Sequence, residues 1–157
     1  MRFLPQAFSN RKVPVAIPRD MQDVVDALKE SKTKMECLRR AYDILSERYH
    51  GHRFKTYTHL TELFSSDLLL FWNRRGFLHC TNLNYLLKIL LVKSGLFKDE
   101  EIFFRWTAIW FVSPHQYVTV KINEADKVNV DLWGKIYGIP FGEYAHGVRS
   151  GSFRERT

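Results

Sequence analysis

The chain has 157 residues, a formal net charge of +7, 45% hydrophobic and 15% aromatic residues. This length suffices for one domain that buries a core without disulfides or metals, and the composition excludes a disordered protein. No stretch approaches the roughly 20 apolar residues of a membrane span, and residues 1–6 lack the apolar core of a signal peptide. We therefore expect a single domain over residues 1–157, in the cytoplasm and without a membrane partner.

The positive charge makes nucleic acid an alternative partner, because lysine and arginine gain affinity by neutralising phosphates. The basic residues are scattered, however, without a long run, zinc-finger spacing or an aromatic RNA-binding signature. A nucleic-acid partner is therefore not expected.

An extended arm is predicted over residues 1–19, where three prolines interrupt any periodicity, and a flexible tail over residues 147–157. Between them, apolar residues at helical spacing predict three helices in the first half of the chain. These helices are expected over residues 20–28, 32–49 and 61–72. Asp20 is expected to cap the first helix, and Gly51 to supply a left-handed turn after the second.

The two cysteines, Cys37 and Cys80, have different surroundings and are too few for a disulfide framework. Cys37 lies beside the apolar stripe of the second helix and is interpreted as a small buried residue. Cys80 opens an apolar run that stops at Gly95, which predicts a helix through the middle of the domain. A thiol in such a first turn is near the positive end of the helix dipole and near free backbone amides, although it can equally be a packed core residue.

Alternating polar and apolar residues predict strands over residues 102–112, 115–122 and 127–133, with a turn at 123–126. The register that gathers the valines on one face sets Val118 opposite Val130 and Val120 opposite Val128. The other face then carries five polar residues: His115, Tyr117, Thr119, Asn129 and Asp131. Asp131 lies one diagonal step from His115, a spacing of about 7–8 Å that side chains can bridge.

Cys80, His115 and Asp131 have the residue types of a cysteine nucleophile, its general base and the carboxylate that orients the base. The alternative is a solvated sheet face on which the histidine and the acid meet no partner. A thiol at a helix start, a histidine at a strand start and an acid on the same sheet face are together what such a centre requires. We therefore predict that the three residues form one catalytic triad.

No metal or other cofactor is predicted. His50, His52 and His59 are not accompanied by a metal-binding spacing, and they are interpreted as solvated loop residues. The chain also lacks a glycine-rich phosphate loop.

Three segments of the chain resemble the transglutaminase-like superfamily: residues 76–80 opening a helix that ends at 94–96, residues 115–120, and residues 130–133. The resemblance covers about residues 60–140. It implies an α+β fold with a papain-like core, in which N-terminal helices and a central cysteine-bearing helix pack on an antiparallel β-sheet. It also implies that Cys80 is the nucleophile, His115 the base and Asp131 the orienting carboxylate.

The chain departs from this family near the thiol. Gly76 stands four residues before Cys80, whereas many members have a glycine two residues before the cysteine, so the approach to the oxyanion site is expected to differ. Trp72 is either an indole donor to that site or a core residue, and core packing is favoured. Trp133 is expected to shield the His–Asp contact from water or to cap the core.

The expected activity is cysteine-dependent acyl chemistry on amide bonds of peptides or proteins, through a thioester on Cys80. Hydrolysis, as in a peptidase or amidase, is preferred to protein-glutamine transglutamination because no added element for a second, amine substrate is evident. The remaining alternative is a non-catalytic module that binds a peptide or nucleic acid on the same fold. The sequence makes no prediction of the oligomeric state.

Overall fold

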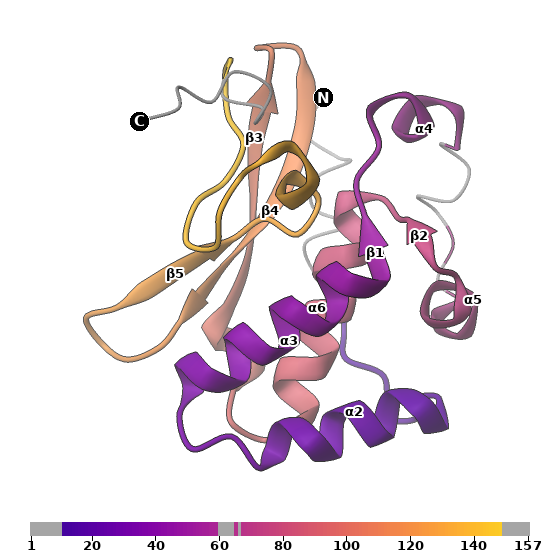
Figure 1. Cartoon of the computed structure of the whole chain (residues 1–157). Coiled ribbons are helices and arrows are strands. Elements are labelled where there is room, and N and C mark those ends of the chain that lie inside the picture. Colours follow the sequence, from indigo (N-terminus) through magenta and orange to yellow (C-terminus); the bar gives the residue numbers. More distant parts are fainter. Residues whose placement is uncertain (1–10, 60–64, 66, 149–157) are drawn as a thin grey trace.

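The computed structural model of the chain describes residues 11–59, 65 and 67–148. Its helices are α2 (Arg19–Lys29), α3 (Lys34–Arg48), α4 (Arg53–Thr58), α5 (Leu68–Asn73) and α6 (Cys80–Lys93), with short 3₁₀ helices η2 (Asp99–Glu101) and η3 (Gly134–Tyr137). Its strands are β1 (Tyr49–His50), β2 (Gly76–Phe77), β3 (Ile102–Ile109), β4 (Ser113–Lys121) and β5 (Lys127–Val130). This mixture of helices and small sheets is consistent with the expected α+β class (Figure 1).

The cysteine-bearing helix α6 is the centre of the core, as predicted. Each of its residues from Thr81 to Leu91 is buried, including the polar Asn82, Asn84 and Lys88. The helix contacts α2, α3 and strand β4 (Figure 1). It ends at Lys93, and Gly95 follows with φ of 79°, in the left-handed conformation that glycine tolerates best.

Helices α2 and α3 bury apolar faces against this centre, but two predicted details of their ends are wrong. Asp20 does not cap α2: the helix starts one residue earlier, after Pro18, and Asp20 lies in its first turn. Gly51 does not supply a left-handed turn, since α3 ends at Arg48 and runs directly into the extended residue Tyr49. The interpretation of Cys37 is confirmed, because its side chain is fully buried.

The helix predicted over residues 61–72 is placed differently in the structure. Residues 61–64 and 66 lie outside the described residues, and Ser65 is not helical. Helix α5 starts at Leu68 behind Asp67, whose Oδ1 accepts a hydrogen bond from the Leu70 amide at 3.0 Å. Helix α4 and the parallel pair β1–β2 were not predicted, because elements this short carry no readable periodicity.

The segments at both ends of the described chain pack on the domain. In the predicted arm, of which residues 1–10 lie outside the described part, the Lys12 carbonyl accepts from the Tyr85 hydroxyl of α6 at 2.9 Å. In the predicted tail, the Gly147 amide donates to the Ala108 carbonyl of β3 at 2.8 Å, and residues 149–157 lie outside the described part.

Strands β3, β4 and β5 form an antiparallel sheet in sequence order. The predicted register is confirmed, with Val118 opposite Val130 and Val120 opposite Val128. Two strands end earlier than expected: β3 stops at Ile109, before a turn at residues 110–112, and β5 stops at Val130, before η3. Among the described residues, no helix combines the length and hydropathy of a membrane span.

Candidate active site

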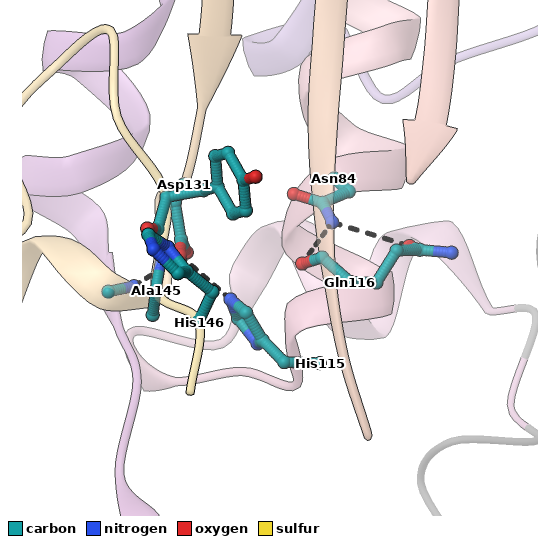
Figure 2. A network of polar contacts seen from close by, with 8 residues as sticks. Asn84, His115, Gln116, Asp131, Ala145 and His146 are labelled. Atoms are coloured by element: carbon teal, nitrogen blue, oxygen red, sulfur yellow. Dashed lines mark hydrogen bonds and ion pairs between the residues drawn. The ribbon is translucent and has the colours of Figure 1, made fainter. Parts of the chain in front are cut away.

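His115 and Asp131 are hydrogen-bonded to each other in the interior of the protein (Figure 2). The distance from His115 Nε2 to Asp131 Oδ2 is 2.8 Å, and the two residues are only 3% and 2% exposed. An ionised carboxylate can only accept hydrogen bonds, so Nε2 carries the hydrogen and donates it. The Nδ1 atom of His115 is then the ring nitrogen that remains for another partner.

The Asp131 carboxylate is fixed by backbone groups as well as by the histidine. Its Oδ1 accepts from the Gly134 amide at 2.8 Å, and its Oδ2 accepts from the Ala145 amide at 2.9 Å. The chain leaves β5 after Val130 and turns into η3, which brings Gly134 back against the carboxylate. A Cβ at Gly134 would lie 2.8 Å from Asp131 Oδ2, so a glycine is required for this close approach.

The C-terminal segment covers the polar face of the β4–β5 hairpin, so this face is not solvated as the alternative interpretation assumed. The ring of Tyr144 stacks on Tyr117 with centroids 4.0 Å apart, and the Gly142 amide donates to the Asn129 carbonyl at 3.1 Å. Asn129 Oδ1 is itself bonded to Thr119 Oγ1 at 2.9 Å. Asn129 is therefore engaged away from His115.

Trp133 lies against the histidine ring, with centroids 5.2 Å apart, and is itself buried. Its position depends on Gly51, where an added Cβ would come within 2.5 Å of the Trp133 ring and of its carbonyl oxygen. Gly51 is thus needed for close packing rather than for a left-handed turn. The predicted core role of Trp133 is confirmed, because the indole belongs to the buried core.

Cys80 is the first residue of α6 and is partly exposed. The first backbone bonds of the helix run from the Asn82 and Leu83 amides to the His79 carbonyl, at 3.1 and 3.0 Å. The helical ladder therefore leaves the Cys80 and Thr81 amides without an intrahelical acceptor, as at any helix start. These amides are the available donors for an oxyanion beside the thiol.

The side chains of Cys80 and Asp131 together set the protonation of His115. Burial lowers the pKa of the imidazole, but the charge and hydrogen bond of Asp131 and the hydrogen bond and charge of Cys80 outweigh it and raise the pKa to about 10. The imidazolium is therefore the form favoured at neutral pH, with Asp131 bonded to Nε2. The structure thus brings the three residues singled out from the sequence into one cluster.

A second buried polar contact holds β4 on α6 beside this cluster (Figure 2). The Asn84 Nδ2 atom donates to the Gln116 carbonyl at 2.8 Å and lies 3.3 Å from Gln116 Oε1. Because Gln116 follows His115 directly, this bond fixes the strand start relative to the cysteine helix. Asn84 was not predicted to matter, although an asparagine inside a helix expected to be buried was a signal that could have found it.

Trp72 is fully buried, as the core interpretation expects. The Arg48 guanidinium lies 3.9 Å from the centre of the Trp72 ring, and the Trp72 carbonyl accepts from the Tyr49 hydroxyl at 2.8 Å.

The three other histidines singled out in the sequence, His50, His52 and His59, do not form a metal site. Among the described residues, no group of three or more His, Cys, Asp and Glu side chains is placed to hold a metal ion. His52 instead caps α4, where its Nδ1 accepts from the Lys55 amide at 3.3 Å.

Comparison of the chain with protein-family models, with curated proteins and with solved structures finds no match.

Proposed function

We propose that this chain is a cysteine-dependent acyl enzyme that hydrolyses amide bonds of peptides or proteins, with a papain-like core of the transglutaminase-like type. The observation that carries the proposal is the buried bond from His115 Nε2 to Asp131, which leaves Nδ1 to the thiol of Cys80. A carboxylate, an imidazole and a thiol in this order are the parts of a nucleophilic triad.

Because its pKa is raised, His115 carries a proton before the substrate binds. In the proposed reaction, the proton that Cys80 gives up to become the nucleophile is held by His115. The thiolate attacks the amide carbonyl carbon, and the Cys80 and Thr81 amides stabilise the oxyanion of the tetrahedral intermediate. His115 then donates its proton to the leaving amine as the C–N bond breaks, which yields a thioester.

Hydrolysis of the thioester completes the cycle. Neutral His115 takes a proton from water, whose oxygen attacks the thioester carbonyl, and the C–S bond breaks to release the acid and the thiolate. A transglutaminase would use an amine in place of this water. We favour water because the described chain shows no added element that would order an amine substrate.

The proposed partner is a peptide or protein substrate, and the proposed location is the cytoplasm. Both described cysteines are free thiols, which fits a compartment that keeps thiols reduced.

The decisive experiment traps the thioester. The protein is mixed with an activated acyl ester, and mass spectrometry of its peptides is expected to find the acyl group on Cys80 and none on Cys37. Cys80→Ala is the matched control and should give no adduct. Addition of a primary amine then separates the two reactions: a hydrolase yields acid at all amine concentrations, whereas a transglutaminase yields an amide that increases with the amine. No adduct with any donor, together with peptide binding that survives Cys80→Ala, would instead indicate a non-catalytic binding module.

A further inference from the structure

A small cavity lies beside the catalytic cluster, between helix α4 and the turn that joins β3 to β4. Its volume is about 90 Å³. Trp133, which contacts the His115 ring, forms one wall, and Thr56 and Tyr57 of α4 form another. Ile109 at the end of β3, Trp110 in the turn and Ser113 at the start of β4 line the other side, and Arg53 of α4 also lines the cavity. Trp133 therefore links the cavity wall to the His115 ring.

The turn beside this cavity has an unfavourable backbone conformation. Trp110 and Phe111 have φ of 54° and 60°, in the left-handed region that side chains with a Cβ disfavour and that large residues rarely adopt. Asparagine and glycine are the usual residues in hairpin turns of this kind. Backbone outliers of this type cluster at functional sites, where the surroundings hold them in place.

Hydrogen bonds and side-chain packing hold the turn from both sides. The Trp110 amide donates to the Gly147 carbonyl at 2.6 Å, and the Phe111 ring lies where a Cβ on Gly147 would be in van der Waals contact. On the other side, the Tyr57 hydroxyl is 2.7 Å from the Ser113 hydroxyl, which ties α4 to the start of β4. The protein thus keeps a tryptophan at a position where glycine would be less strained, and this tryptophan walls the cavity.

We propose that this cavity, named here the α4 pocket, binds an aliphatic side chain of the peptide substrate close to the bond that Cys80 attacks; the inference rests on the proposed function. The lining supports the ligand chemistry, because two indoles, a phenol ring and an isoleucine supply more of the surface than Arg53, Thr56 and Ser113. The volume of the α4 pocket supports the proposed size of the side chain. The pocket is smaller than a cavity that holds benzene in another protein, so it suits a short aliphatic side chain such as that of valine or leucine. An aromatic ring is too large, since benzene occupies an apolar cavity of about 150 Å³ in another protein.

The test separates binding from catalysis. Cys80→Ala protein is titrated with a positional library of hexapeptides, and the native protein is tested for hydrolysis of the same library. At one position, leucine or valine should be favoured over alanine by about 10-fold or more, the usual effect of filling an apolar pocket. Placing Trp110→Gly in the Cys80→Ala protein should abolish this preference, because it removes a wall while relieving the left-handed strain.

Phe111→Gly is the matched control, because it relieves the same strain one residue later and Phe111 does not line the pocket. It should keep the preference. Thr56→Leu provides a second test from the α4 side, since it fills the pocket and should also abolish the preference. Equal loss in Trp110→Gly and Phe111→Gly would overturn the proposal, as would a preference for acidic or aromatic side chains.

The experiments distinguish an error in the pocket proposal from an error in the proposed function. Hydrolysis by the native protein without any aliphatic preference overturns the pocket and leaves the function standing. An aliphatic preference in binding that depends on Trp110, without hydrolysis or an acyl adduct, supports the pocket as a side-chain site and overturns the catalytic proposal.

Discussion

Asp131 bonds to His115 although the backbone pairing of their strands stops one residue short of Asp131. The last paired residues are Val118 and Val130, and the chain then turns into η3. The turn directs the carboxylate back along β4, where it meets the imidazole at 2.8 Å. The oxygens of Asp131 accept hydrogen bonds from Gly134, Ala145 and His115. These three bonds hold the carboxylate in one orientation. This arrangement suits an orienting group better than a group that exchanges protons with substrate.

Replacing Asp131 by asparagine should damage both catalysis and stability. The variant keeps the size of the side chain but replaces one oxygen by an NH₂ group, which must face a backbone amide or His115. Loss of such buried bonds costs about 1–3 kcal/mol, and turnover should fall by several orders of magnitude, as in the serine-protease triad. Thermal unfolding and an established hydrolysis assay measure the two effects. Full activity with unchanged stability would contradict the role of Asp131.

Asn129→Ala is the matched control for this variant. Asn129 belongs to the same hairpin face, but its side chain bonds to Thr119 rather than to His115. The control should lose a little stability and retain turnover. Loss of turnover in Asn129→Ala alone would transfer the orienting role to Asn129.

The sequence predicted the hairpin and the central helix because both follow from strong periodic patterns. The valines of β4 and β5 tolerate only one register, and that register places His115 near Asp131. The contacts that position Asp131 could not be predicted, because the Gly134 and Ala145 amides reach it through non-periodic segments after β5. Gly51 was misinterpreted for a related reason: close approach to Trp133, a residue far along the chain, has no local signal.

The two cysteines should differ in reactivity toward iodoacetamide. Cys80 is partly exposed, so the reagent can reach its sulfur, and it lies beside His115, which can accept its proton. Cys37 is buried, and this burial raises the pKa of its thiol. Mass spectrometry of labelled peptides at pH 6 should therefore show Cys80 alkylated at least about 10-fold faster. His115→Ala should slow Cys80 alone. Slow labelling of both thiols with ordinary thiol pH dependence would remove the main support for the triad.

Gly134→Ala should impair activity more than stability. The added Cβ would lie 2.8 Å from Asp131 Oδ2 and 2.9 Å from its Cγ, so the carboxylate must shift away from the position in which it meets His115. Gly95→Ala is the control, since Gly95 has a left-handed φ of 79° but nothing within 4 Å of the added Cβ. It should lose about 1–2 kcal/mol of stability through backbone strain and keep its turnover. Comparison of kcat and unfolding temperature for both variants tests this; equal effects on turnover would show that the Gly134 contact does not position the carboxylate.

The stability of the native protein should fall as the pH rises from about 6.5 to about 10. The pKa of His115 is raised to about 10 in the folded state, whereas an unfolded histidine titrates near 6.5. Between these values the folded state binds a proton at His115 that the unfolded state has lost, so the free energy of unfolding decreases with pH. The contribution is complete below about pH 6.5 and is lost as the pH passes the folded value. Urea unfolding across this range should show the decrease in the native protein and a smaller one in Cys80→Ser, where the Asp131 contacts remain but the contribution of Cys80 to the raised pKa of His115 is gone. His115→Gln removes the titrating ring and should remove this part of the slope. A slope that is the same in all three proteins would contradict the raised pKa of His115, because other groups would then cause it.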